Sequence, residues 1–374
     1  MSLRIAVIHD WLVGIRGGEK VLEEILSVIE KKLQYDKLEI YTLVHKKESQ
    51  SEIVEKQNIN TSFIQHLPFG LKKYRNYLPF FPSAIESFNL KDFNLIISSS
   101  HAVAKGVIPP VGAVHISYSH TPMRYIWDHY HTYFGNKRGL KRIFYSTVAS
   151  YLRIWDRVSS DRVDYFIANS ENVRRRIERY YRRNSEVIYP PVDTDFFLCD
   201  EKVEKKDYFL LVSAMVPYKR VDLAIKTFNK NGLPLKVVGD GPDFKKLKKI
   251  AKDNIEFLGR VNNSELKILY SESRALIFPA EEDFGIIPVE AQACGTPVIA
   301  YGKGGALETI VDEETGLFFD RQTEEALLLA IDKFLNKRFN SELIRKNSLR
   351  FSKKNFREKF SLFIERVMRD RKSD

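Results

Sequence analysis

The chain has 374 residues, of which 44% are hydrophobic and 29% are charged. This length suffices for two domains with hydrophobic cores, and the composition excludes an intrinsically disordered chain. The formal net charge of +11 indicates an anionic partner, which can be a nucleotide, a nucleic acid or an anionic membrane surface.

The sequence has no apolar run of the roughly 18 residues that a membrane-spanning helix needs. Its two cysteines, Cys199 and Cys294, are too isolated for a disulfide framework or a zinc site, so we expect a reduced, cytoplasmic protein. The first apolar run, 5–8, is interrupted by His9 and Asp10, a pattern that does not predict a signal peptide. Any membrane contact is therefore expected to be peripheral.

Short apolar runs alternate with longer amphipathic stretches, which predicts repeated β-α units around parallel sheets. In the first half, we expect strands at 5–8, 38–43, 95–98, 113–118, 165–168 and 187–188. In the second half, we expect strands at 209–213, 235–238, 255–258, 275–278, 298–300 and 317–319. The turns at 189–195 and the charged segment 200–207 predict a linker between the halves. Doubly wound sheets bind ligands beyond the carboxyl ends of their strands, so a cleft between two domains is the expected site.

The first predicted strand leads into a turn that contains Gly17 and Gly18, and residues 19–29 then show apolar residues at helical spacing. Glycines at such a junction allow the backbone to approach a phosphate closely, although a tight turn without any ligand explains them equally well. The fingerprint G-x-G-x-x-G follows no predicted strand, which disfavours a dinucleotide-dependent dehydrogenase.

Two tracts of the first half combine aromatic and basic residues. The first tract contains Phe69, Lys72, Lys73, Tyr74, Arg75, Tyr77, Phe80 and Phe81, and the second contains Lys137, Arg138, Lys141, Arg142, Phe144, Tyr145, Tyr151, Arg153 and Trp155. Such a composition suits a surface that rests on anionic lipid headgroups, but core aromatics beside a solvated basic face explain it as well. A third, arginine-rich cluster at 174–183 follows a strand and a helix-start signal, so we expect a solvated helix face and no nucleic-acid binding.

His120 follows the predicted strand 113–118, at the carboxyl edge of the first sheet. A histidine there can hydrogen-bond a ligand in the cleft, or exchange a proton with it, near neutral pH. A structural role remains the alternative. The neighbouring histidines, His115, His129 and His131, have no spacing that places three ligands on one face, so we expect no metal site.

Three turns of the second half are expected at one rim of its sheet. Lys219 and Arg220 follow the strand 209–213, and two adjacent cations there can neutralise a diphosphate. The turns 239–242 and 259–261 follow the next two strands. Each of the three is also ordinary turn chemistry when it is considered alone.

The stretch 278–300 has the pattern strand, loop, helix, strand, with Pro288 expected to open the helix and Gly295 to end it. The helix start leaves the N–H groups of 284–287 without helical partners, which creates a partly positive pocket for a phosphate or a sugar hydroxyl. Glu282 precedes this pocket and Glu290 follows it. A charged surface loop and a favourable helix dipole explain either acid alone.

Taken together, these residues resemble family GT4 of the retaining glycosyltransferases, and among them the bacterial mannosyltransferases that build O-antigen and related polysaccharides. The most specific part is Glu282-x7-Glu290 with Phe284-Gly285 between the acids and Ala293-Cys294-Gly295-Thr296-Pro297-Val298 behind them; Gly17-Gly18-Glu19, His120-Thr121-Pro122 and Gly239-Asp240-Gly241-Pro242 support it. The resemblance covers nearly the whole chain. It implies the GT-B architecture, an α/β fold of two Rossmann-like, doubly wound parallel-sheet domains that face each other across a cleft, with a C-terminal helix that crosses back to the first domain.

The resemblance further implies an acceptor-side domain at 1–198, a nucleotide-sugar-binding domain at 199–350 and a C-terminal helix at 351–374 packing on the first domain. The implied catalytic residues are His120, which contacts the sugar near its reacting carbon, and Glu282, which holds the donor sugar. The residues implied to bind the rest of the donor are Gly17, Gly18 and Lys219 for the phosphates, Asp283, Phe284, Gly285, Ile286 and Ile287 for sugar and phosphates through their backbone, Gly259, Arg260 and Val261 for the base, and Glu290 for the ribose hydroxyls.

One position departs from the family pattern. The family usually has an arginine five residues before the phosphate-binding lysine, and this chain has Ala214 there. We expect Arg220, which stands where the family often has glycine, to supply the missing charge. Unchanged donor affinity in Arg220→Ala would contradict that expectation.

The implied reaction is the transfer of a hexose from a nucleotide diphosphate sugar to a saccharide or a lipid-linked saccharide, with retention of the anomeric configuration and without a metal or another cofactor. GDP-mannose is favoured over a UDP-sugar as the donor, and the implied location is the cytoplasm, with a peripheral position at the inner membrane face left open. Two alternatives stay open: a sugar-nucleotide 2-epimerase of the same fold, and a basic protein without catalysis that binds nucleic acid or membranes.

Overall fold

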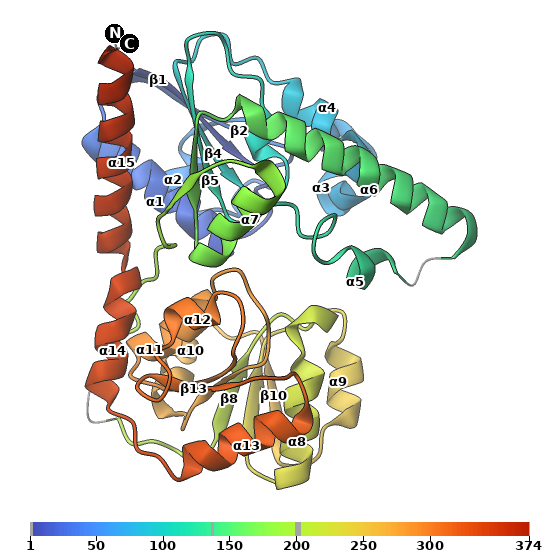
Figure 1. Cartoon of the computed structure of the whole chain (residues 1–374), viewed down its shortest axis with the longest axis vertical. Coiled ribbons are helices and arrows are strands. Elements are labelled where there is room, and N and C mark those ends of the chain that lie inside the picture. Colours follow the sequence, from blue (N-terminus) through green and yellow to red (C-terminus); the bar gives the residue numbers. More distant parts are fainter. Residues whose placement is uncertain (1–2, 136–137, 199–202, 374) are drawn as a thin grey trace. The chain divides into compact units, whose positions relative to one another are not determined.

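The computed structural model describes residues 3–135, 138–198 and 203–373 and divides into two compact units (Figure 1). The first unit comprises Met1–Tyr189 and Phe356–Asp374, and the second unit comprises Pro190–Asn355. Lys137, Cys199 and part of the predicted charged linker lie outside the described residues. Among the helices that are described, none is both long enough and apolar enough to cross a membrane.

The first unit is built around a seven-stranded parallel sheet with the strand order β3-β2-β1-β4-β5-β6-β7. Its strands are β1 (Leu3–His9), β2 (Tyr35–Thr42), β3 (Asn58–Thr61), β4 (Leu95–Ser100), β5 (Val114–Ser119), β6 (Tyr165–Ala168) and β7 (Ser185–Val187). Its α-helices are α1 (Gly17–Lys32), α2 (Glu52–Glu55), α3 (Gly70–Lys73), α4 (Phe81–Glu86), α5 (Tyr130–Phe134), α6 (Gly139–Ser159), α7 (Glu171–Tyr181) and most of α15 (Lys353–Ser373). Short 3-10 helices are η1 (Phe63–His66), η2 (Tyr74–Phe80), η3 (Ala104–Gly106) and η4 (Ser160–Arg162).

Alternation along the central strands explains why this sheet is covered on both faces. In β1, Ile5 and Val7 belong to the hydrophobic cluster that contains α1 and α15, whereas Ala6 and Ile8 belong to the cluster that contains α4 and the buried side of α6. Both clusters consist of fully buried aliphatic and aromatic side chains, so the strand reads as a continuous apolar run.

The second unit contains a six-stranded parallel sheet with the order β10-β9-β8-β11-β12-β13. Its strands are β8 (Phe209–Val212), β9 (Leu235–Val238), β10 (Ile255–Gly259), β11 (Leu276–Phe278), β12 (Val298–Tyr301) and β13 (Gly316–Phe319). Its helices are α8 (Val221–Asn231), α9 (Phe244–Ile250), α10 (Asn263–Glu272), α11 (Ile286–Ala293), α12 (Ala306–Thr309), α13 (Glu324–Leu335), α14 (Ser341–Ser348), η5 (Pro217–Lys219) and η6 (Leu349–Phe351). Two clusters again cover the two faces of the sheet, one with α8 and α13 and the other with α10 and α11.

The units divide at Tyr189 and Asn355, whereas the sequence places the corresponding boundaries at 198 and 350. Residues after Tyr189 fold with the second unit because Val192 exchanges backbone hydrogen bonds with the segment around Phe351, 2.9 Å from the Val192 nitrogen to the Phe351 oxygen. Phe197 then fills the core of the second unit beside Tyr270. The neighbouring Lys353–Asp193 contact joins residues 160 positions apart in sequence, so this pairing leaves no local signal.

The predicted α/β fold, with two parallel sheets and a C-terminal helix that returns to the first domain, is confirmed. The predicted strands correspond to observed ones within a few residues, but the polar edge strand β3 was not predicted because Asn58-Ile59-Asn60-Thr61 has little apolar character. Two helix starts also differ: α1 begins at Gly17, and α11 begins at Ile286, two residues before the expected Pro288. Gly285 explains the second difference, since its φ of 89° lets the chain enter the helix early.

Candidate functional site

In each sheet, the strand order reverses at one point, and in doubly wound folds ligands bind outside the carboxyl ends of the strands at that point. In the first unit, the reversal lies between β1 and β4, where His9 is paired in register with Ser99. In the second unit, it lies between β8 and β11, whose carboxyl ends lead to Lys219 and to Glu282. The candidate site residues therefore gather at two edges, one in each unit.

In the first unit, one hydroxyl joins two histidines. The Ser99 Oγ lies 3.1 Å from His9 Nδ1 and 2.8 Å from His120 Nε2, so the hydroxyl donates to one neutral ring and accepts from the other. Gly18 lies above them, since a Cβ at this glycine would be 3.6 Å from His9 and 3.7 Å from His120. Gly17 precedes it as the first residue of α1. The structure thus places Gly18 next to His120, with Gly17 as its neighbour in the chain.

Asp10 fixes the loop that follows β4. Its carboxylate accepts hydrogen bonds from the backbone nitrogens of residues 101–104, at 2.6 to 2.9 Å, and lies 3.0 Å from His101 Nδ1. The His101 ring therefore has a fixed position, 6.1 Å from the His120 ring between centroids. A buried carboxylate with this many donors acts as a structural anchor for the edge.

Burial and mutual repulsion lower the pKa values of His120 and His101 at this edge. Burial lowers the pKa of His120 well below its usual value, and the charges that His101 and His9 would carry lower it further. Burial also lowers the pKa of His101, although Asp10 opposes this shift. Burial raises the pKa of Glu19, but the hydrogen bond and the charge of His9 more than offset it, so the net pKa is lowered. His120 is therefore suited to hydrogen bonding and not to carrying a permanent charge.

In the second unit, Lys219 forms an ion pair with Glu282, and both side chains are largely buried. Lys219 comes from η5 after β8, and Glu282 comes from the loop after β11. The backbone of that loop is held by Gly305, whose nitrogen lies 2.8 Å from the Glu282 oxygen. A Cβ at Gly305 would lie 2.3 Å from the Phe284 backbone, so this close approach requires glycine.

Helix α11 begins directly beside this pair. Gly285 and the first helical residues, Ile286 and Ile287, present N–H groups that have no acceptor within the helix. Phe284 is buried against the Phe351 ring, and Asp283 beside it is part-buried. Positive helix-end charge and the Lys219 ammonium therefore lie at the same end of the sheet as Glu282.

Glu290 lies in the second turn of α11 and is 5% exposed. The Tyr270 hydroxyl of α10 donates to Glu290 Oε2 at 3.2 Å, and this contact raises the pKa of Tyr270, after burial, which raises it most. The tyrosine thus orients the carboxylate that the sequence singles out.

The side chain of Arg220 contacts other residues than that of Lys219 does. Its φ of 53° is left-handed, and its guanidinium lies 3.3 Å from Asp222 and 3.4 Å from the Gln322 side chain. Ala214 is exposed at the preceding turn. The two adjacent cations therefore have separate partners in the structure.

The loop after β10 has mixed exposure. Gly259 has a φ of 69°, Val261 packs against the hydrophobic cluster around α10, and Arg260 is 81% exposed with its Nε 3.5 Å from Asp240. The neighbouring turn needs its glycines, since a Cβ at Gly239 would lie 1.9 Å from the Ser213 oxygen.

Sequence reasoning did not select His9, Ser99, His101 or Glu19 as site residues. A signal was present for three of them, because His9, Ser99 and His101 stand at or just beyond the carboxyl ends of predicted central strands, as His120 does. Glu19 could be found only through its contact with His9, at 3.7 Å. Among the residues that the structure describes, no group of three or more His, Cys, Asp or Glu is arranged to hold a metal ion.

Two family models match the two halves of the chain. Residues 15–196 match the model for Glycosyltransferase Family 4, and residues 199–355 match the model for Glycosyl transferases group 1.

Similar sequences include the O-antigen chain mannosyltransferase RfbU of Salmonella typhimurium, 34% identical over 206 residues that cover 50% of this chain and 58% of the relative. A GDP-mannose-dependent α-(1-6)-phosphatidylinositol monomannoside mannosyltransferase of Mycobacterium tuberculosis is 30% identical over 178 residues, which cover 40% of this chain and 46% of the relative. An uncharacterized glycosyltransferase of Methanocaldococcus jannaschii is 29% identical over 209 residues, covering 54% of this chain and 59% of the relative. The chain thus spans about half the length of the relatives it matches.

Solved structures resemble the chain over nearly its whole length. HepE of Anabaena, in complex with UDP, has a TM-score of 0.71 at 15% identity, covering 97% of this chain and 100% of that one. WaaG, a glycosyltransferase involved in lipopolysaccharide biosynthesis, has a TM-score of 0.61 at 15% identity, covering 95% and 94%. At 15% identity, these solved structures show only that the fold is shared. Membership of the family rests on the two family models. The chain belongs to family 4 of the glycosyltransferases and has the GT-B fold.

Proposed function

We propose that the protein transfers a hexose from a nucleotide diphosphate sugar to a saccharide or lipid-linked saccharide in polysaccharide or glycolipid synthesis. The observation that carries the proposal is the Lys219–Glu282 ion pair beside the start of α11, at the point where the second sheet reverses its strand order. GDP-mannose is the favoured donor, and mannose the favoured transferred sugar, because two similar sequences are named as mannosyltransferases and one of them is GDP-mannose-dependent. A UDP-sugar remains the competing donor, since the HepE structure contains UDP.

Breaking the anomeric bond leaves negative charge on the departing diphosphate, so the enzyme must stabilise that charge in the transition state. The Lys219 ammonium and the N–H groups of Ile286 and Ile287 are the groups for this role. The reaction as proposed needs no metal ion because these groups supply the positive charge. A requirement for added Mg²⁺ would contradict this part of the proposal.

Glu282 has two roles in the proposal: it positions Lys219 through their ion pair, and it accepts hydrogen bonds from hydroxyls of the donor sugar. Asp283, Phe284 and Gly285 contribute backbone atoms beside it. Glu290 accepts from the ribose hydroxyls, held in place by the Tyr270 hydroxyl. The loop Gly259, Arg260 and Val261 lines the base.

In the first unit, His120 hydrogen-bonds the sugar near its reacting carbon as a neutral imidazole, and Gly17 and Gly18 leave space for the donor phosphate. The two carboxylates of that edge are already used: Asp10 accepts from four backbone nitrogens, and Glu19 accepts from the Arg16 nitrogen at 2.9 Å. We therefore propose retention of configuration by reaction on one face of the sugar, without a covalent sugar-enzyme intermediate.

The decisive experiment measures thermal stabilisation of the protein by a panel of GDP-, UDP- and ADP-sugars. A ligand that binds only the folded state raises the free energy of unfolding. We expect GDP-mannose to give the largest increase in melting temperature, and Glu290→Ala to abolish it. The anomeric configuration of the product of the stabilising donor, read from proton NMR couplings, then tests retention. Absence of any stabilisation across the panel would overturn the proposed function.

A sugar-nucleotide 2-epimerase would use the same nucleotide-binding half. Incubation of the protein with the donor alone separates the two activities, because an epimerised nucleotide sugar counts against transfer.

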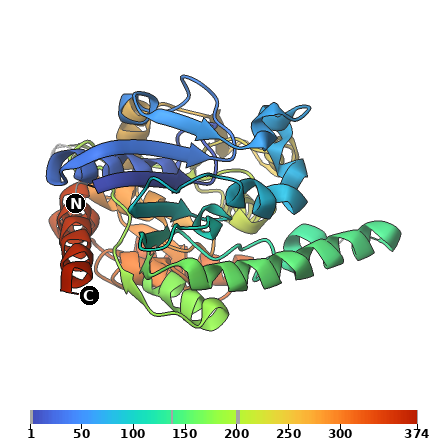
Figure 2. The same cartoon turned by 90° about the horizontal axis from the view of Figure 1, so that it is seen from above.

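We further propose a peripheral position at an anionic membrane surface, and helix α6 supports it. Leu140, Ile143, Phe144, Tyr151, Ile154 and Val158 are all exposed and lie on one face of α6, opposite its buried residues. Figure 2 shows α6 extending beyond the rest of the first unit. Lys141 and Arg142 are exposed in the first turn of the same helix, and an exposed apolar stripe on a helix that also carries cations suits an interface with anionic headgroups.

Co-sedimentation with phosphatidylglycerol vesicles tests this position. We expect Ile143→Asp/Ile154→Asp to abolish binding, whereas Ser146→Asp/Ser150→Asp, which adds the same charge beside the stripe, retains most of it. Equal losses in the two variants would show that only charge matters and would remove α6 from the proposal.

A further inference from the structure

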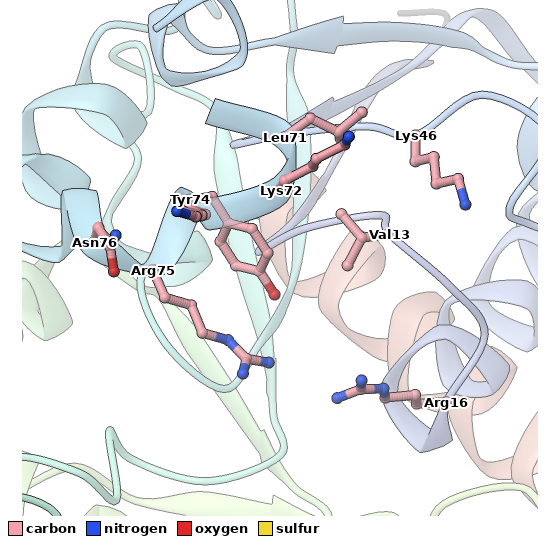
Figure 3. Close-up of a pocket in the computed structure, with 9 residues that line it drawn as sticks. Val13, Arg16, Lys46, Leu71, Lys72, Tyr74, Arg75 and Asn76 are labelled. Atoms are coloured by element: carbon pink, nitrogen blue, oxygen red, sulfur yellow. The ribbon is translucent and has the colours of Figure 1, made fainter. Parts of the chain in front are cut away.

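The first unit carries a hollow of about 710 Å³ that we name the basic pocket (Figure 3). Five of its nine lining residues are cationic, and none carries a carboxylate: Arg16, Lys46, Lys72, Lys73 and Arg75. All five side chains are exposed, and within the described part of the chain none of them forms an ion pair. Five cations around one hollow repel each other unless an anion lies between them.

Several contacts give the basic pocket a defined shape. Its floor is the buried Tyr74 ring, which packs on Trp11 with 5.2 Å between centroids. The Arg75 guanidinium lies over this ring at 5.5 Å, and the Lys73 ammonium lies over the Phe69 ring at 5.2 Å. Phe69 itself has a φ of 56°, a conformation that a non-glycine residue adopts only when its surroundings enforce it.

The basic pocket adjoins the histidine edge of the same unit. Trp11 contacts Tyr74 on one side and His101 on the other, with its ring 4.4 Å from the His101 ring. The Arg75 charge is close enough to lower the pKa of His101, although burial lowers it most. His101 in turn lies next to His120. Whatever the pocket holds is therefore near the residue proposed to contact the reacting sugar.

We propose that the basic pocket binds a phosphate or diphosphate group of the acceptor, so that the acceptor is an anionic saccharide or glycolipid. This inference rests on the proposed function. The donor diphosphate already has cationic partners in the second unit, in Lys219 and the start of α11, and Gly17 and Gly18 of the first unit only leave space for it. We therefore assign the separate cationic site of the first unit to the other substrate. In Figure 3 the guanidinium groups of Arg16 and Arg75 both lie towards the hydroxyl end of Tyr74, and guanidinium groups are donors that suit phosphate oxygens. The volume falls within the roughly 300–1,000 Å³ of small-molecule sites.

Binding of geranyl diphosphate, a soluble lipid diphosphate, tests the proposal on the full chain by calorimetry in saturating GDP and, in parallel, saturating UDP. The nucleotide fills the proposed donor site, so the probe reports on other sites. The pocket variant is Arg16→Gln/Lys73→Gln/Arg75→Gln. The control is Lys31→Gln/Lys32→Gln/Lys91→Gln, which removes the same charge from exposed lysines of the same unit outside the pocket.

We expect the pocket variant to bind geranyl diphosphate at least about tenfold more weakly than the control, the change that one lost charge-assisted contact produces. Equal affinities in the two variants overturn the proposal. Melting temperatures establish that both variants fold, and the single pair Arg75→Gln and Lys91→Gln replaces the triple variants if one does not.

Phosphatidylglycerol vesicles distinguish an acceptor phosphate from a lipid headgroup. The two triple variants carry the same net charge, so we expect them to bind vesicles equally. Selective loss of vesicle binding in the pocket variant assigns the pocket to the membrane and overturns the proposal. Stabilisation by nucleotide sugars is measured separately on both variants. If nucleotide sugars stabilise them but the probe does not distinguish them, only the acceptor site fails; if no nucleotide sugar stabilises them, the proposed function fails.

Discussion

Gly18 leaves just enough space over two histidine rings for a substrate atom or for one methyl group. A Cβ at this position would make ordinary van der Waals contacts with His9 and His120, at 3.6 and 3.7 Å, and Gly18 lies in the first turn of α1. Gly18→Ala should therefore fold normally and even gain up to about 1 kcal/mol of helix stability. The methyl group would nevertheless occupy the space beside His120 that the proposed function assigns to the donor.

We accordingly expect Gly18→Ala to keep or raise the melting temperature and to lower the transfer rate by about tenfold or more, since a small misplacement of the reacting groups is costly. Rates from a transfer assay and melting curves on the same preparation provide the check. A wild-type rate in this variant would mean that no substrate atom uses the space over His120.

His115 provides a pH-dependent prediction away from the site. Burial lowers its pKa from 6.5 to about 3, and its Nε2 lies 2.9 Å from the Ser98 hydroxyl while Nδ1 lies 3.3 Å from the Arg162 oxygen. In the folded state the His115 ring therefore stays neutral to a lower pH. As the pH falls, the ring takes up a proton in the unfolded state first. The stability that neutral His115 contributes is complete above about pH 6.5 and is lost as the pH falls toward 3.

Replacing His115 with glutamine removes this proton linkage. Between pH 6 and 4, the free energy of unfolding of His115→Gln should fall less steeply than that of the wild type, by about 1.4 kcal/mol per pH unit. Urea unfolding at several pH values measures both slopes, and an overall destabilisation of the variant does not affect the comparison. Parallel slopes would show that His115 is protonated in the folded state.

The difference between predicted and missed site residues has a physical basis. Glu282 and Glu290 stand in a motif whose spacing is local, so the sequence contains it. The cluster of His9, Ser99 and His120 depends on the pairing of strands about 90 residues apart. Such pairing is decided by tertiary packing, which periodicity does not report.

Among the elements, α6 and α7 are joined to η3 by a buried polar network. The Lys105 ammonium lies 3.0 Å from Asp156 Oδ1 and 2.8 Å from the Ser159 hydroxyl, and the Tyr181 hydroxyl donates to Asp156 Oδ2 at 2.9 Å. Lys105 and Asp156 are at most 2% exposed. The network fixes the helices on the sheet, and Lys105 compensates the Asp156 charge in the core.

Lys105→Met leaves the Asp156 carboxylate buried without its cation, and we expect the free energy of unfolding to fall by about 3–5 kcal/mol. Lys105→Met/Asp156→Asn removes both charges and should regain part of the loss. Denaturant unfolding of the three proteins measures the effect. If the double variant were less stable than the single one by the full cost of a second mutation, the two residues would not be coupled.

The element boundaries that the sequence could not predict follow from backbone conformation. Gly285 starts α11 two residues early because its positive φ allows a sharp entry, and Pro288 then occupies a first-turn position where no N–H is needed. The long, strongly periodic helices such as α1 and α15 were predictable because their apolar stripes repeat over several turns.

At the scale of the whole molecule, the last helix, α15, packs in the unit that contains the first half of the chain. Phe356, Phe360, Phe363 and Ile364 of α15 are all at most 3% exposed and complete the core formed by β1, β4 and α1. The helical spacing of these residues is visible in the sequence, and the partner face was implied by family resemblance alone. The core of the first unit is thus complete only once α15 is present.

Phe360→Ala tests this arrangement, with Leu362→Ala as the control on the opposite side of the same helix. Phe360 is fully buried and stacks on Phe356 at 5.5 Å between centroids, whereas Leu362 is 58% exposed. We expect Phe360→Ala to lower the free energy of unfolding by about 3–5 kcal/mol and Leu362→Ala to change it by no more than about 0.5 kcal/mol. Hydrogen exchange should also become faster in β1 and β4, which share the cluster with Phe360, while the amides of β8 and β11 remain protected. Equal effects of the two substitutions, or faster exchange confined to the second sheet, would place α15 outside the core of the first unit.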